Sequence, residues 1–234
     1  MRPGQVQARE VRPGEARSYD VSVPTPDAQL RGILTIPEGS VGVVLFAHGS
    51  GSGRLSPRNT AVARTLQEAG LATLLMDLLT RDEESADART GHLRFDIELL
   101  ARRVCGATKW LREYPDTRSL PIGIFGASTG AAAALLAAVN DRDISAVVSR
   151  GGRPDLAMEH LGDVRAPTLL VVGGNDIPVI PLNQEAAAAL RCEHDFVIVP
   201  GASHLFEEEG ALDAVSALAA EWFRRHLSAA GPAA

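Results

Sequence analysis

Aromatic residues are scarce in this 234-residue sequence, which contains six Phe, two Trp and two Tyr spread along the chain. Proteins that bind single-stranded nucleic acids stack bases on aromatic side chains set among basic ones, and no segment has that pattern. The formal net charge of −6 also disfavours a polyanionic partner. We therefore expect no nucleic-acid partner.

Long apolar runs are also absent. No run approaches the roughly 20 residues of a membrane-spanning helix, and residues 1–17 lack the apolar segment of a secretory signal peptide. The two cysteines, Cys105 and Cys192, lie far apart in the sequence. We expect two free thiols in a reducing compartment rather than a disulfide. These features predict a cytoplasmic protein without membrane contact.

Metal-binding and phosphate-binding motifs are missing as well. No pair of His, Cys or carboxylate residues with metal-ligand spacing has a partner pair elsewhere. The glycine-rich segment 49–53 lacks the Gly-Lys-Ser/Thr of a P-loop, because the only lysine of the chain is Lys109. We expect neither a metal ion nor a cofactor.

A regular alternation of apolar and amphipathic segments fills most of the chain. Two stretches with alternating polarity, 18–23 and 30–36, predict an antiparallel start to a sheet. Nearly continuous apolar runs, typical of buried parallel strands, follow at 41–47, 71–76, 120–125, 144–149, 168–172 and 196–199. Helical segments are expected at 59–69, 93–113, 131–139, 182–190 and 208–225.

This order of elements predicts the fold class and the domain organisation. Alternating strands and helices form an α/β fold, a mostly parallel sheet with helices on both faces. A single domain is expected over 18–228, after an N-terminal arm (1–17) and before a frayed tail (229–234). Residues 150–166 are too few for a sizeable lid, so we expect an open site.

The candidate nucleophile is Ser128, which lies in Gly-Ala-Ser-Thr-Gly (126–130) between an expected strand and an alanine-rich helix. A G-x-S-x-G motif in this context predicts a nucleophile elbow, a strained turn that exposes the serine hydroxyl. Gly126 and Gly130 are small enough to let the helix pack back against the strand. The helix N-terminus then offers the N–H of Thr129 to an oxyanion.

Two further residues complete a catalytic set in the order Ser, Asp, His. Asp176 and His204 each follow an expected strand, and the carboxyl ends of parallel strands meet at one edge of a sheet. This chain order is that of α/β-hydrolases and differs from those of chymotrypsin and subtilisin. Asp155 follows the preceding strand and is an alternative acid.

A glycine-rich loop after the expected strand 41–47 could supply a second oxyanion donor. The sequence there is His-Gly-Ser-Gly-Ser-Gly (48–53), and we assign the donor to the N–H of Ser50, with Gly51 as the alternative. His48 is expected to support its own loop through hydrogen bonds. His160 is expected on a surface helix, and His92, His194 and His226 belong to no motif.

These motifs resemble the α/β-hydrolase superfamily, and within it the dienelactone hydrolase-like branch, over about residues 19–227. The chain is also similar to the hydrolase-like domain attached to phosphoribosyltransferase domains in some bacterial proteins, although it contains no phosphoribosyltransferase motif. Dienelactone hydrolases carry cysteine in G-x-C-x-G, whereas this chain has Ser128. The resemblance therefore implies a serine esterase that cleaves small carboxylic esters through an acyl-enzyme.

Other activities stay open at this point. The same residues serve dienelactone or lactone hydrolysis, thioester hydrolysis and amide hydrolysis. A non-catalytic binding module with this fold is the alternative from another class. The expected partner is a small-molecule ester, and the oligomeric state is left open.

Candidate substrate-binding residues flank the catalytic positions. Arg81 and Arg150 each follow an expected strand and could bind a substrate carboxylate, as in a dienelactone. A structural ion pair, from Arg81 to Asp82 or Asp77, is the competing interpretation. Four apolar residues could line an acyl pocket or belong to the core: Leu79, Ile177, Leu205 and Phe206.

Overall fold

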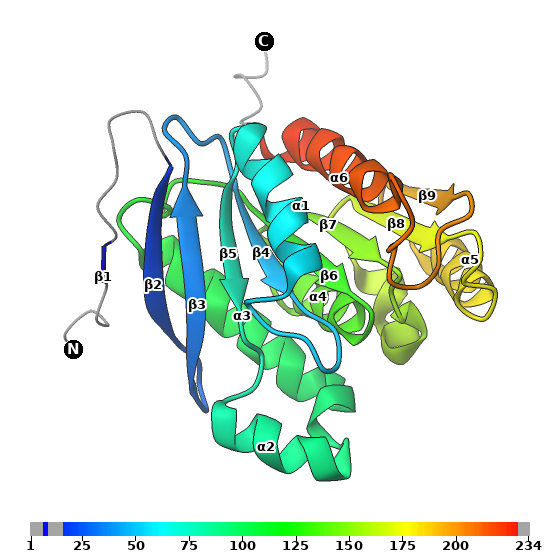
Figure 1. The fold of residues 1–234 in the computed structure, drawn as a ribbon, viewed down its shortest axis with the longest axis horizontal. Helices are drawn as coiled ribbons and strands as arrows, with labels where there is room; N and C mark the ends of the chain where they lie inside the picture. The colour runs from blue at the N-terminus through cyan, green and yellow to red at the C-terminus, as the bar shows by residue number, and fades with distance from the viewer. Residues whose placement is uncertain (1–6, 9–15, 229–234) are drawn as a thin grey trace.

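A computed structural model describes residues 7–8 and 16–228 of the chain. Its centre is a nine-stranded sheet with the strand order β1-β2-β3-β5-β4-β6-β7-β8-β9 (Figure 1). The strands are β1 (Gln7–Ala8), β2 (Arg17–Pro24), β3 (Gln29–Ile36), β4 (Val43–Ala47), β5 (Ala72–Met76), β6 (Ile122–Ala127), β7 (Ile144–Arg150), β8 (Thr168–Gly173) and β9 (His194–Val199). The expected tail, 229–234, and most of the expected arm lie outside the described residues.

The sheet is antiparallel at its start and parallel elsewhere. β1, β2 and β3 pair antiparallel, and β3 pairs antiparallel with β5. All later pairs, from β5–β4 to β8–β9, are parallel. The predicted antiparallel start and the mostly parallel α/β fold are therefore confirmed.

Helices cover both faces of the sheet, as predicted (Figure 1). One face packs against α1 (Pro57–Glu68) and α6 (Ala211–Leu227) and contains one of two apolar cores. The other core lies under α3 (Ile97–Glu113), α4 (Thr129–Asn140), η2 (Pro154–Asp163) and α5 (Val179–Ala189). The segment expected to be too short for a lid forms only the 3-10 helix η2.

Helix α4 is buried almost from end to end, and its composition explains how. Residues 129–138 are all buried, because α4 packs against the sheet, α3 and η2. Alanine side chains allow this close approach, and they give up little side-chain entropy on burial. The start of α4 is thereby fixed against the core, and the preceding residue, Ser128, is half-buried.

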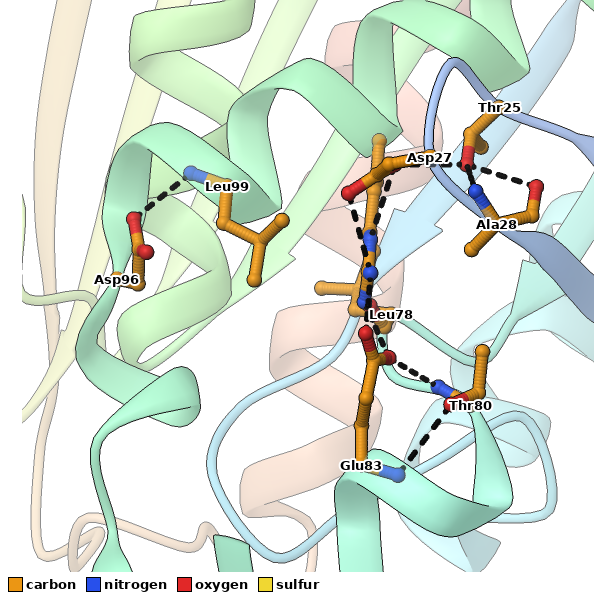
Figure 2. A network of polar contacts seen from close by, with 9 residues as sticks. Thr25, Asp27, Ala28, Leu78, Thr80, Glu83, Asp96 and Leu99 are labelled. Carbon is orange, nitrogen blue, oxygen red and sulfur yellow. Dashed lines mark hydrogen bonds and ion pairs between the residues drawn. The ribbon is translucent and has the colours of Figure 1, made fainter.

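The segment between β5 and α3 differs from the sequence prediction. We expected one helix over 93–113, but α3 begins at Ile97, where the Asp96 side chain accepts a hydrogen bond from the N–H of Leu99 (2.9 Å) (Figure 2). It is preceded by the unpredicted helix α2 (Arg81–Thr90) and by η1 (Leu93–Phe95). In α2 only Asp87 is buried, so the apolar periodicity that reveals most helices is missing.

Among residues 7–8 and 16–228, no helix combines the length and the apolar character needed to cross a membrane.

Candidate active site

Ser128 occupies a strained turn between β6 and α4. Its φ is +51° and its ψ −122°, in a region that non-glycine residues rarely adopt. The Ser128 N–H donates to the carbonyl of Arg150 (3.2 Å), and the Ser128 carbonyl accepts from the N–H groups of Ala131 and Arg153 (3.1 Å each). Three backbone hydrogen bonds therefore hold the turn of Ser128 in this conformation.

The two glycines of the motif are required by packing. A Cβ on Gly126 would lie 2.5 Å from the Cα of Ala131, and one on Gly130 would collide with the carbonyls of Ala47 and His48. No side chain fits either position without moving the backbone of the helix or of β4. The steric reason for the G-x-S-x-G pattern is thus visible in this chain.

Asp176 and His204 meet at the carboxyl edge of β8 and β9. The His204 Nδ1 lies 2.6 Å from the Asp176 Oδ2. Two bonds from Asn175 join their loops: its N–H donates to the carbonyl of Ala202 (2.9 Å), and its side chain donates to the carbonyl of Gly201 (2.8 Å). Asp176 is buried, whereas the side chain of His204 is 38% exposed. The carboxylate therefore fixes one ring nitrogen of a histidine that solvent can reach.

The loop of His204 approaches the turn of Ser128 through Gly151. Gly151 follows Arg150, whose carbonyl binds the Ser128 N–H, and a Cβ on Gly151 would lie 3.5 Å from His204 Nδ1. The hydrogen bonds among the described residues include none between the side chains of Ser128 and His204. A complete Ser-His-Asp relay therefore stays a prediction, and the His204–Asp176 pair is its observed part.

The alternative acid, Asp155, is bound elsewhere. Its two carboxylate oxygens accept from Nε and Nη2 of Arg153 (2.8 and 2.7 Å). Asp176 is the carboxylate that contacts His204, so the alternative assignment is wrong in this structure. His160 is exposed in η2, as expected for a surface position.

The glycine-rich loop after β4 lies against the turn of Ser128. The Ser50 Oγ is 3.2 Å from the Thr129 Oγ1, and a Cβ on Gly49 would come within 2.9 Å of the Ser128 Cβ. Neither Ser50 nor Thr129 donates its N–H to another backbone group among the described residues. Both residues therefore lie near the serine, and their role as oxyanion donors stays a prediction.

His48 supports this loop through hydrogen bonds, as the sequence predicted. It is buried, its Nδ1 lies 2.9 Å from the Gly49 carbonyl, and its Nε2 accepts from the Leu78 N–H (2.8 Å). Burial lowers the pKa of His48, because a charged imidazole would lose its hydration. The neutral tautomer with a proton on Nδ1 satisfies both bonds.

A buried arginine continues this chain of contacts. Arg103 is 1% exposed; its Nη1 donates to the carbonyl of Leu78 and to Glu83 Oε2 (2.8 Å each), and its Nη2 donates to Glu83 Oε1 (2.7 Å) and Asp27 Oδ2 (3.2 Å). Its two carboxylate partners, Asp27 from the β2–β3 turn and Glu83 from α2, are labelled in Figure 2. The hydrogen bonds from Arg103 lower the pKa of Glu83 to about 2.

Sequence reasoning missed Arg103, although a signal was present. Arg103 lies within the apolar stripe of α3, between the buried residues Leu100 and Ala107. Burying an arginine at such a position is costly unless acceptors surround it. The Thr80-to-Glu83 capping box was a second signal: the Thr80 Oγ1 accepts from the Glu83 N–H, and the Glu83 carboxylate accepts from the Thr80 N–H.

The two arginines proposed to bind a substrate carboxylate lie in different environments. Arg81 is the first residue of α2 and is exposed, and the predicted partner Asp77 instead pairs with Arg54. Arg150 is 7% exposed, and burial lowers its pKa to about 10. Its Nε and Nη1 have no hydrogen-bond partner among the described residues.

The four apolar candidates also have different environments. Phe206 is 1% exposed and belongs to the core under α1 and α6, so it does not line an open pocket. Ile177 and Leu205 are 68% and 38% exposed, which leaves their role as substrate contacts a prediction. Leu79 lines a cleft beside Ser50 and Thr129.

This cleft, which we call the α2 cleft, has a volume of about 190 Å³. Its walls are the loop 48–52, the segment 77–79 after β5, the inner side of α2 and η1, and single residues of α3 and α4, Leu100 and Thr129. The unpredicted helix α2 thus forms one wall of the cavity next to the candidate oxyanion donors. Ser128, Asp176 and His204 do not line this cleft, so the open site expected from the sequence stays a prediction.

The fold and the site together define the class of protein. A mostly parallel sheet with an antiparallel start, a serine at a strained strand–helix turn and an Asp–His pair at the same sheet edge make up the α/β-hydrolase fold. Within it, the chain belongs to the dienelactone hydrolase family, whose sequence model matches residues 30–230.

Similar proteins agree with this family. A dienelactone hydrolase from Anabaena variabilis, solved by crystallography, is 59% identical, with a TM-score of 0.89 over 91% of this chain and 99% of the other. A protein of Mycobacterium tuberculosis named "Putative phosphoribosyl transferase" is 54% identical over 92% of this chain and 48% of its own length. This chain therefore spans about half the length of that relative.

A more distant structure shows the same fold. A dienelactone hydrolase-like promiscuous phosphotriesterase from metagenomic libraries is 17% identical, with a TM-score of 0.74 over 91% of this chain and 99% of the other. The family and its fold are those of hydrolases.

Proposed function

We propose that this chain is a serine hydrolase that cleaves small carboxylic esters through an acyl-enzyme on Ser128. The observation that carries the proposal is the 2.6 Å contact between His204 Nδ1 and Asp176 Oδ2 beside the strained turn of Ser128. A carboxylate at Nδ1 keeps a proton there and leaves Nε2 as the basic nitrogen. That is the tautomer a general base for a serine requires.

The reaction then follows from the positions of these groups. His204 Nε2 takes the proton from Ser128 Oγ while Oγ forms a bond to the ester carbonyl carbon. The oxyanion of the tetrahedral intermediate accepts hydrogen bonds from the N–H groups of Thr129 and Ser50. Protonated His204, stabilised by Asp176, gives its proton to the departing alcohol, and water activated by His204 releases the acid.

The nucleophile is a serine rather than the cysteine of dienelactone hydrolases, which makes a general base necessary. A serine hydroxyl is a weak nucleophile without such a base, and His204 is the candidate for this role. The relatives' other named activities, dienelactone hydrolysis and phosphotriester hydrolysis, use substrates that a panel can include. A binding module would need none of these residues.

The test is labelling and turnover with matched variants. A fluorophosphonate should label Ser128, and Ser128→Ala should lose both labelling and at least about 10⁴-fold in hydrolysis of a nitrophenyl ester. Ser119→Ala, at an exposed serine before β6, should behave as the unmodified protein. Asp176→Asn should lower kcat by about 10⁴-fold, because the wrong histidine tautomer is stabilised. Labelling and turnover that survive Ser128→Ala would refute the proposal.

A further inference from the structure

Most of the charged side chains that line the α2 cleft form ion pairs. In one pair, Arg94 Nε lies 2.6 Å from Asp87 Oδ2, and Arg94 Nη2 donates to the Asp87 carbonyl (2.8 Å). In the other, Asp77 accepts from the backbone N–H of Arg54 (2.7 Å) and from its guanidinium. Among the described residues, no arginine of the cleft lining is therefore free to bind a ligand.

One carboxylate of the lining has no such partner. Glu84 lies on α2 and lines the cleft, and no arginine or histidine forms an ion pair with it among the described residues. Burial lowers the pKa of His48, which lines the same cleft, and the nearby charges of Asp77 and Glu84 oppose that change. Glu84 and Ser50 line the same cleft.

The arginines expected to bind a substrate carboxylate do not place a positive charge in the cleft. Arg81 is exposed at the start of α2, and Arg150 is buried; neither is part of the cleft lining. Leu78, Leu79 and Leu100 add no charge to the walls, and Glu84 is exposed to solvent, so its carboxylate acts on a charged ligand mainly at low salt.

We propose that the α2 cleft selects neutral and cationic acyl groups and rejects anionic ones, with Glu84 as the residue that sets this specificity. The inference rests on the proposed function, since the cleft adjoins the oxyanion donors Ser50 and Thr129. It assigns to this chain a substrate class that differs from the carboxylate-bearing ligand predicted from Arg81 and Arg150.

Three nitrophenyl esters with acyl groups of similar length test the proposal. The 4-(trimethylammonio)butyrate is cationic, the 5,5-dimethylhexanoate is its neutral counterpart of the same shape, and the 4-sulfobutyrate is anionic without attacking its own ester. At low salt, kcat/KM should be highest for the cationic ester and about tenfold lower for the anionic ester than for the neutral one. High salt should reduce these ratios, because it screens the charge of Glu84.

The matched variants are Glu84→Gln and Asp82→Asn. Asp82 is an exposed residue of the same helix that does not line the cleft. Glu84→Gln should reduce the cation-to-anion ratio about fivefold. Asp82→Asn should leave the ratio near its original value. Equal turnover of the anionic and neutral esters, or an unchanged ratio in Glu84→Gln, would overturn the proposal.

Failure of the proposed function can be recognised separately. Turnover of the neutral ester and labelling of Ser128 report on the hydrolase, whereas the ratios report on the cleft. Calorimetric binding of the three intact esters to Ser128→Ala measures charge selection without any turnover. Tighter binding of the cationic than of the anionic ester, lost in the double variant with Glu84→Gln, supports the inference. Equal binding of the two charged esters contradicts it.

Discussion

Arg103 and Arg150 are both buried, but the hydrogen bonding of their guanidinium groups differs. Arg103 donates to the Leu78 carbonyl, to both oxygens of Glu83 and to Asp27. Arg150 ends β7 and has two nitrogens without a hydrogen-bond partner among the described residues. A buried charge costs several kcal/mol unless acceptors surround it. The first arginine meets that condition, and the second does not.

The difference indicates what each residue contributes to the site. The side chain of Arg103 fixes the Leu78 carbonyl, and the Leu78 N–H in turn holds His48 at the base of the loop that carries Ser50. For Arg150 the part in contact with the site is the backbone, since its carbonyl accepts the Ser128 N–H. The guanidinium of Arg103 therefore organises the site, whereas any residue of suitable size could provide the carbonyl of Arg150.

The largest effect is expected from removing the guanidinium of Arg103. Arg103→Met would leave Glu83 and the Leu78 carbonyl without their donor, and the free energy of unfolding should fall by about 3–5 kcal/mol. Denaturant unfolding measures this loss. Arg102→Met replaces the exposed neighbour on the same helix and should change stability by less than about 0.5 kcal/mol. Similar losses in the two variants would show that the Arg103 contacts contribute little.

Acid should weaken the same network in a predictable range. The folded protein holds the pKa of Glu83 at about 2, below its ordinary value of 4.5, through the hydrogen bonds of Arg103. A carboxylate with a lowered pKa contributes stability that is complete above about pH 4.5 and is lost as the pH falls towards about 2. The side chain of Glu83 is 30% exposed, so we expect roughly 2 kcal/mol rather than the full value of the shift.

Unfolding at two pH values measures this contribution. The stability difference between the unmodified protein and Glu83→Gln should be largest near neutral pH and should shrink at about pH 3. Glu98→Gln removes an exposed carboxylate from α3 and should show no comparable change with pH. A difference for Glu83→Gln that is constant over this range would mean that Arg103 does not lower the pKa of Glu83.

Unlike the environments of the two arginines, several features of the fold and the site could be predicted from the sequence. The parallel strands were predicted because each is an almost unbroken apolar run, and the elbow because only glycine fits at 126 and 130. The order of Asp176 and His204 along the chain was sufficient to predict that they meet. These features depend on local sequence and on the shared edge of parallel strands.

Other features depend on contacts that sequence order does not reveal. Helix α2 has no apolar stripe, because its Glu83 and Asp87 face arginines instead of a core. Phe206, with a φ of +56°, follows His204 closely, yet its ring lies in the core and does not line the α2 cleft. Arg81 and Arg150 follow strands in the same way, and only the surrounding side chains show that one is exposed and the other buried.

The smallest effect is expected from Arg150. Because no acceptor loses a partner when this guanidinium is removed, Arg150→Met should keep the unfolding free energy within about 1 kcal/mol and could raise it, since a buried unpaired charge disappears. Its carbonyl, and therefore the bond to the Ser128 N–H, is retained by any side chain. Ester turnover should accordingly change by less than about twofold. Denaturant unfolding and steady-state kinetics, with Arg142→Met at an exposed turn before β7 as the control, measure both quantities. A loss as large as that of Arg103→Met would mean that Arg150 holds a counterion in solution, and the two buried arginines would then follow the same rule.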